Sequence, residues 1–165
     1  MIQNLIIKNF ALIEKLKVDF TGGFIVLSGE TGAGKSIILD AISLLSGKRS
    51  DRESLFDKEK KCILESQLHL ESDKEYLFKK HNLDFESETI IRREISPNGK
   101  SRSFVNDTPV SLSVLGEIVS SNLEIYSQNQ SFSLKSEEKQ LNLIDKLADS
   151  RNLLNKYQTL FAEYN

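Results

Sequence analysis

The sequence is poor in the residues that mark several classes of protein. Its single cysteine, Cys62, cannot form an internal disulfide, which excludes the small disulfide-stabilised secreted folds. No apolar run approaches the ~20 residues of a membrane-spanning helix. The opening MIQNLIIKNF lacks the basic region and the cleavage site of a signal peptide. We therefore expect a cytoplasmic protein with no membrane partner.

An excess of charge of one sign is also missing. The chain has 22 Lys and Arg against 24 Asp and Glu, a net charge of −2, so no overall field attracts nucleic acid or an anionic membrane. Any contact with DNA must therefore be local. With 39% hydrophobic and 28% charged residues, a chain of 165 residues is ordinary for one globular domain with a proper core.

Glycine is also sparse, but half of the eight glycines lie in one stretch, FIVLSGETGAGKSIILDAISLLSG, residues Phe24 to Gly47. Within it, Gly29–Ser36 matches the phosphate-loop pattern G-x-x-x-x-G-K-[ST]. Phe24–Leu27 resembles a short buried strand, and Ile37–Leu45 is apolar almost all round, like a helix beneath a sheet. This context makes a ligand-free Gly-rich turn the weaker alternative. The stretch predicts a bound nucleoside triphosphate with Mg²⁺, ATP being the expected nucleotide.

Each residue type in this motif has a chemical role. Backbone N–H groups of Gly32–Ser36 would surround the phosphates at the helix N-terminus, where the helix dipole favours an anion. The Lys35 ammonium would reach the β and γ oxygens, and the Ser36 hydroxyl would bind Mg²⁺. The predicted nucleotide-binding residues are Gly29, Glu30, Thr31, Gly32, Ala33, Gly34, Lys35, Ser36 and Ile37.

The remaining pattern predicts more antiparallel sheet than a doubly wound fold contains. In the segment Cys62–Leu70, alternation puts Cys62 on the apolar face, as a core thiol and not a nucleophile. We expect an α+β fold with a β-rich subdomain beside the phosphate-loop core. The other expected strands are Leu5–Phe10, Leu16–Phe20, Glu88–Ile95, Ser101–Asn106 and Leu123–Tyr126, and the other expected helices lie at Ser72–His81 and around Leu112–Val119.

The end of the chain changes character. After Ser136 there is no Gly or Pro, and apolar residues recur at alternating steps of four and three. These positions are Leu143, Leu147, Ser150, Leu154, Tyr157, Phe161 and Tyr164. The seam spans only about three heptads, so the start of a coiled coil and an amphipathic helix packed on the domain both remain open. We expect domains at 1–135 and 136–165, and a chain cut short, because the pattern has no stop signal at Asn165.

The second half of an NTP-hydrolysing site is missing. Such a site needs an acidic residue at the end of a strand and a group that orients water, and Asp19, Asp40 and Asp145 are all unsuitably placed. Gln128, in EIYSQNQ, is the best candidate for a second Mg²⁺ contact beside Ser36, and a plain polar loop residue is an equal alternative. The chain is therefore expected to hold ATP without hydrolysing it efficiently.

A charged stretch follows the motif helix. It carries Lys48, Arg49 and Arg52, which could contact a phosphate backbone, although a solvated loop is the commoner outcome for such a segment. Arg92, Arg93 and Arg102 are weaker candidates for the same role.

Four segments resemble the N-terminal part of the RecN family of bacterial DNA repair proteins. They are LIIKNFALIEKLKVDF, GETGAGKSIILDAISLLSGKR, SRSFVNDTPVS and LEIYSQNQSFSL, in the family's order. The resemblance implies an SMC-like ABC ATPase head, with Gln128 as the Q-loop glutamine. In that class a C-terminal lobe beyond a coiled coil supplies the catalytic glutamate, and ATP joins two heads on DNA.

The chain departs from related sequences at two places. It has YSQNQSF where RecN relatives usually have a His-rich run, and Ala11 where many SMC-type heads have a basic residue. The second departure is itself typical of the RecN group. A stand-alone nucleoside or metabolite kinase and a non-catalytic interaction module are the competing interpretations. Extending the reading frame beyond Asn165, to look for a coiled coil and an LSGGE-like signature, would separate them.

Overall fold

The computed structural model describes residues 1–20, 22–29, 34–50, 54–125, 140–141, 144–145, 147–148 and 151–164. The chain divides into two compact units, Met1–Glu124 and Ile125–Asn165, and each is described by itself. The expected domain boundary at 135/136 lies outside the described residues and stays a prediction.

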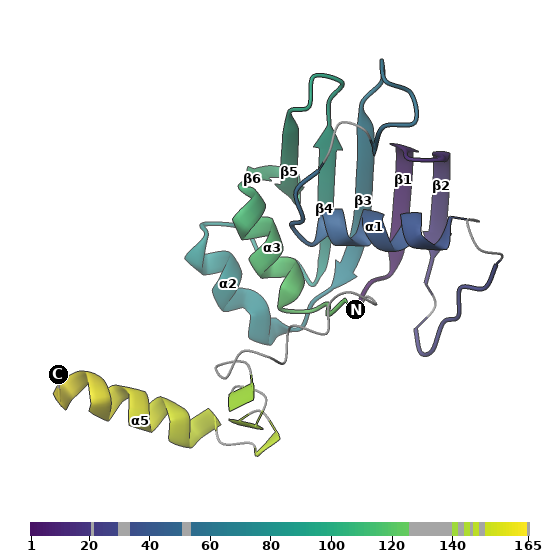
Figure 1. Ribbon diagram of the computed structural model, residues 1–165. Coiled ribbons are helices and arrows are strands. Elements are labelled where there is room, and N and C mark those ends of the chain that lie inside the picture. The colour runs from purple at the N-terminus through teal and green to yellow at the C-terminus, as the bar shows by residue number, and fades with distance from the viewer. Residues whose placement is uncertain are drawn as a thin grey trace. The chain divides into compact units, whose positions relative to one another are not determined.

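The first unit is built on a six-stranded antiparallel sheet with the order β2-β1-β3-β4-β5-β6 (Figure 1). The strands are β1 Asn4–Phe10, β2 Ile13–Asp19, β3 Cys62–His69, β4 Glu88–Ile95, β5 Ser101–Val105 and β6 Thr108–Val110. The first five were predicted within a few residues. The three-residue β6 was not, because it contains a proline and shows no alternation. A two-residue turn, Asn106 and Asp107, both with positive φ, joins it to β5.

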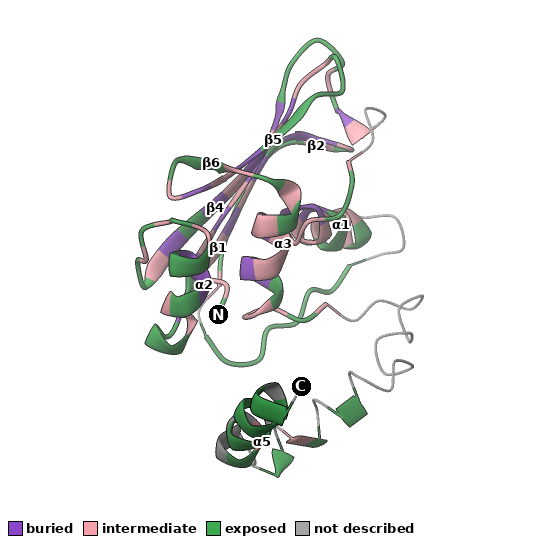
Figure 2. Ribbon diagram, turned by 90° about the vertical axis from the view of Figure 1, so that its left-hand side faces the viewer, coloured by how far each residue is buried: buried purple, intermediate pink, exposed green. Residues whose placement is uncertain are grey.

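Two helices cover one face of the sheet. They are α1 Lys35–Leu45, the predicted motif helix, and α3 Leu112–Ser120. Ser111 caps the start of α3, because its Oγ accepts a hydrogen bond from the Val114 amide at 3.3 Å. The predicted helix at 72–81 is a 3₁₀ turn, η2 Ser72–Lys74, followed by α2 Glu75–Lys80. Figure 2 shows the buried positions concentrated on the strands and on the helix sides that face them.

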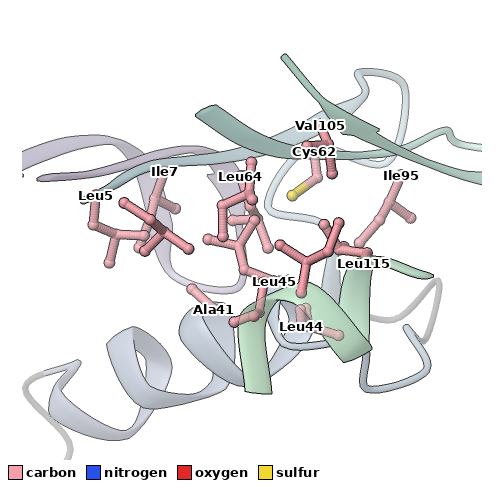
Figure 3. Close-up of a cluster of buried hydrophobic side chains, with 14 of the residues drawn as sticks. Leu5, Ile7, Ala41, Leu44, Leu45, Cys62, Leu64, Ile95, Val105 and Leu115 are labelled. Carbon is pink, nitrogen blue, oxygen red and sulfur yellow. The ribbon is translucent and has the colours of Figure 1, made fainter. Parts of the chain in front are cut away.

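The core lies between this face of the sheet and the two helices (Figure 3). Ile7, Leu64 and Ile95 of the strands and Ala41 and Leu45 of α1 are almost completely buried. Burial raises the pKa of the Cys62 thiol to about 12, which leaves it protonated and unreactive at neutral pH. The prediction of a core thiol is confirmed.

Two predicted strands are wrong. Residues 24–27 form no strand, and Phe24 is 94% exposed, because no strand of the described chain runs beside this segment to complete its hydrogen bonds. Residues 123–125 also form no strand, and Tyr126 lies outside the described residues. In both places an apolar run resembled a buried strand, but the sheet does not extend to it.

The second unit contains α5 Arg151–Tyr164. Its heptad positions Tyr157, Phe161 and Tyr164 are exposed, and the rings of Tyr157 and Phe161 stack with centroids 5.8 Å apart. The start of a coiled coil and an amphipathic helix packed on the domain therefore both remain possible interpretations of this segment. No helix among the described residues is long and apolar enough to cross a bilayer.

Candidate nucleotide-binding site

The two ends of the phosphate loop meet at the start of α1. Gly34 precedes the helix with φ 89°, a left-handed conformation that a side chain would strain, so the second motif glycine is required by the backbone. Its carbonyl accepts the Ile38 amide at 3.1 Å, which closes the first turn. The Lys35 ammonium donates to the carbonyl oxygen of Gly29, so the motif's first glycine lies next to its lysine. Residues 30–33 lie outside the described residues.

A hollow of about 530 Å³ opens beside this helix start, between the β1–β2 hairpin and α1. Apolar residues line it from both sides, Ile13 and Leu16 of β2 and Ile37 and Ile38 of α1, together with the charged Glu14 and Lys15, and Gly34 lies at the helix end. The volume lies within the usual range of about 300–1,000 Å³ for small-molecule sites. An apolar wall next to a helix N-terminus suits a ligand with an apolar ring system and an anionic tail.

Sequence reasoning found one side of this hollow and missed the other. Gly34 and Ile37 were predicted from the motif, whereas Leu12, Ile13 and Leu16 come from the hairpin. The only available signal was the hairpin's position immediately before the motif. Which face of a hairpin meets a later helix depends on packing and cannot be read from local alternation.

The Mg²⁺ prediction stays a prediction. Ser36 lies in the first turn of α1 and is exposed, so its hydroxyl is accessible at the phosphate end of the helix. Gln128, the other predicted ligand, lies outside the described residues.

The opposite end of α1 is held by a buried arginine. Arg93 of β4 is only 1% exposed, and its Nη1 donates to the carbonyl of Leu44 at 2.7 Å and to that of Lys48. Its Nε donates to Ser101 Oγ at 3.0 Å. Burial lowers the pKa of Arg93 from its usual value, but the guanidinium stays charged and complements the negative end of the helix dipole. Arg93 therefore cannot contact DNA, which corrects the prediction made from its charge.

Small residues bring the same end of α1 against α3. Gly47, just after the helix, has φ 94°, and a β-carbon placed there would lie 3.0 Å from Gly116 Cα. The pair thus forms a close backbone contact between the two helix regions. Together with Arg93 it determines where α1 lies on the sheet, and so where the phosphate loop begins.

Exposed apolar residues lie on both sides of the phosphate loop in the sequence. Val26 is 68% exposed and Leu39, on α1, is 46% exposed, although both belong to segments predicted to be buried. Within the described part of the chain, nothing covers them. Exposed apolar residues grouped around a functional motif are typical of a surface that another protein segment covers.

The residues predicted to meet DNA have different surroundings. Lys48 lies 3.8 Å from Asp40, Arg49 is exposed, and Arg52 lies outside the described residues. Arg92 lies 3.4 Å from Asp107 and 4.6 Å above the ring of Phe104. Among the described residues, Lys48 and Arg92 thus each have an acidic neighbour of their own.

The class that the structure defines is a fold class: a P-loop fold like the N-terminal lobe of an ABC/SMC-type head, as the sequence predicted. The Smc head domain with a coiled coil and joint from Pyrococcus yayanosii matches 98% of the chain and 35% of its own, with a TM-score of 0.71 and 22% identity. The recombination mediator protein RecF-ATPrS matches 72% of the chain and 29% of its own, with a TM-score of 0.54 and 26% identity.

The chain belongs to the AAA domain family, whose model matches residues 4–164. The DNA repair protein RecN of Bacillus subtilis (strain 168) is 43% identical over 99% of the chain and 29% of its own length. RecN of Haemophilus influenzae is 36% identical over 96% of the chain and 30% of its own length. The predicted resemblance to RecN is confirmed, and the kinase interpretation is not favoured. The chain spans less than a third of each of these relatives.

Proposed function

We propose that this chain is the ATP-binding lobe of a RecN-like ATPase head that acts in DNA double-strand break repair and recombination. The observation that carries the proposal is the phosphate loop at the start of α1, where Gly34 borders a hollow of about 530 Å³ and Lys35 donates to the Gly29 carbonyl. Lys35 and the backbone amides would hold the triphosphate, Ser36 and Gln128 would hold Mg²⁺, and Ile13, Leu16 and Ile37 would contact the base or ribose.

Calorimetric titration with Mg-ATP tests the binding site. Lys35→Ala should weaken binding at least tenfold, because a charge-assisted contact to phosphate contributes roughly 1.5–3 kcal/mol. Lys79→Ala is the matched control, since Lys79 is exposed on α2 and pairs with Glu75 of the same helix, at 2.9 Å. Equal affinities for the Lys35 variant and the unaltered chain would refute the assignment of the phosphate loop.

Hydrolysis is proposed to need a second lobe. The surface around Val26 and Leu39 supports this, because it is apolar, exposed and next to the phosphate loop. We expect residues 1–165 to bind Mg-ATP without turnover above background, because binding alone does not supply an oriented water or a base. Phosphate release by this chain alone, lost in Lys35→Ala, would contradict the split-head proposal.

The expected partners follow from the same proposal. They are the C-terminal lobe of the same protein, a second head joined through nucleotide, and DNA, on which the protein would act in the cytoplasm near the nucleoid. Adding the C-terminal lobe in trans should restore some ATP hydrolysis. Lys48, Arg49 and Arg52 remain proposed DNA contacts, to be tested by charge-neutralising variants in a DNA titration.

A further inference from the structure

Two lysines lie directly opposite each other on the face of the sheet away from α1. Lys8 of β1 pairs with Lys15 of β2 in the antiparallel register. The neighbouring Ile7 is fully buried toward α1, so Lys8 points to the opposite face, and both lysines are exposed. Like charges directly opposite across two strands destabilise the pair. Neither lysine forms an ion pair within the described part of the chain.

A third strand and a fixed loop bring two more lysines to this place. The side chain of Asn9 accepts the Asp57 amide at 2.6 Å and donates to the carbonyls of Asp57 and Lys60 at 3.0 and 2.8 Å. Asn9 is only 7% exposed and has φ 57°, so the fold keeps it in an unfavourable conformation to make these bonds. The loop that leads into β3 is thereby held beside β1, and Lys60 and Lys61 with it.

These groups border a second hollow of about 280 Å³, lined by Lys8, Lys15, Lys60 and Lys61 together with Glu14 and Asp57. Lys60 lies 2.9 Å from Asp57, and Lys61 lies 3.2 Å from Glu94. Asp57, Glu94 and Glu14 together offset three of the four lysines, so the surroundings of the hollow keep one net positive charge. An excess of positive charge around an open hollow attracts anions.

The geometry points to a contact for the phosphodiester backbone of duplex DNA at this lysine patch, residues 8, 15, 60 and 61. The inference rests on the proposed function in DNA repair. The patch spans β2, β1 and the loop that leads into β3, about 10 Å at the usual strand spacing of ~4.8 Å. Lysines spread over this width can meet more than one phosphate of a DNA strand. Lysines of this kind fix position on DNA without reading its sequence.

The patch is also continuous in the chain with the proposed contacts Lys48 and Arg49. Lys60 and Lys61 lie at the end of the same segment, which passes the β1–β2 hairpin through the pairing of Phe10 with Leu55.

Fluorescence anisotropy of a short labelled duplex, without nucleotide, tests the inference between about 50 and 200 mM salt. The test variant is Lys8→Gln with Lys15→Gln. The matched control is Lys79→Gln with Lys100→Gln, which removes the same charge from α2 and from the β4–β5 turn. We expect the test variant to bind about tenfold more weakly at ~50 mM salt, with a salt slope lower by about two units. The control should stay close to the unaltered chain.

A measurement of folding accompanies the titration. The urea midpoint of the test variant should equal or exceed that of the unaltered chain, because the repulsion between the two lysines is removed. Equal losses of DNA affinity in both variants would show attraction by total charge and would overturn the inference. So would the absence of DNA binding by the unaltered chain at low salt. The proposed ATP function is decided separately by the Mg-ATP titration of the unaltered chain.

Discussion

The two ends of α1 have opposite surroundings. At its C-terminal end, Arg93 donates to the carbonyls of Leu44 and Lys48, and Gly47 contacts Gly116 backbone to backbone. At its N-terminal end, Gly34 borders an open hollow, and the exposed side chain of Val26 lies in the preceding segment. The difference indicates a division of roles: one end determines the position of the helix, and the other presents its free N–H groups to a ligand.

The largest expected effect is at the fixed end. Arg93→Met removes the guanidinium, so the Leu44 carbonyl keeps the Gly47 amide as a donor and the part-buried Lys48 carbonyl loses the Arg93 donor. We expect the free energy of unfolding to fall by about 2–4 kcal/mol, because unsatisfied buried polar groups each cost ~1–3 kcal/mol. Urea denaturation followed by circular dichroism measures it. Arg102→Met, on an exposed position of β5, is the control. An equally large loss of stability in this variant would show that Arg93 has no special role in fixing the end of α1.

Gly47→Ala should come next. The residue has φ 94°, and the added methyl group would lie 3.0 Å from Gly116 Cα. Strain and crowding of this kind cost about 1–3 kcal/mol. Gly99→Ala has a similar φ of 81° but open space around its β-carbon, so it separates backbone strain from crowding. Equal unfolding midpoints for Gly47→Ala and Gly99→Ala would show that crowding against Gly116 does not contribute to the loss of stability.

At the N-terminal end of α1, Lys35→Ala should weaken ligand binding and leave the stability of the fold almost unchanged. The free energy of unfolding should change by no more than about 0.5 kcal/mol, because the side chain contributes little to the core. Binding of Mg-ATP should nevertheless fall at least tenfold, or ~1.4 kcal/mol. Denaturation and calorimetry on the same preparation measure both. A destabilised Lys35 variant would show that the phosphate end also supports the fold.

The smallest effect is expected away from α1. Glu117 of α3 accepts from Lys80 Nζ at 2.6 Å and lies 2.9 Å from His81 Nε2. The bond from Lys80 first, and then that from His81, lowers the pKa of Glu117 below its usual 4.5. The carboxylate therefore stabilises the fold above about pH 4.5, and this contribution is lost as the pH falls through the lowered pKa.

Urea midpoints at neutral and acidic pH measure this contribution. The midpoint of Glu117→Gln should lie below that of the unaltered chain at neutral pH, and the two should converge in acid. Glu86→Gln is the control, because Glu86 is exposed and its side chain makes no ion pair among the described residues. A difference between Glu117→Gln and the unaltered chain that does not change with pH would exclude the ion pairs as its cause.

Local patterns determined much of the fold. β4 was predicted with its correct bounds, and β3 to within one residue, because alternation of apolar and polar residues directly records which face of a strand is buried. The phosphate loop was found because four residues at fixed spacing, Gly29, Gly34, Lys35 and Ser36, must each satisfy a local requirement of phosphate binding. Such signals lie within one segment, so one sequence suffices to find them.

Only the tertiary structure decided which segments find a partner. By its charge alone, Arg93 resembled a surface residue. The structure places it between Ile91 and Ile95 on the core face of β4, against the end of α1. Phe24–Leu27 resembled a buried strand, but the sheet has its edges at β2 and β6 and does not reach it. The pairing of Lys8 with Lys15 depends on the hairpin register. In all three cases the outcome depends on the contacts of a distant segment, which no local pattern contains.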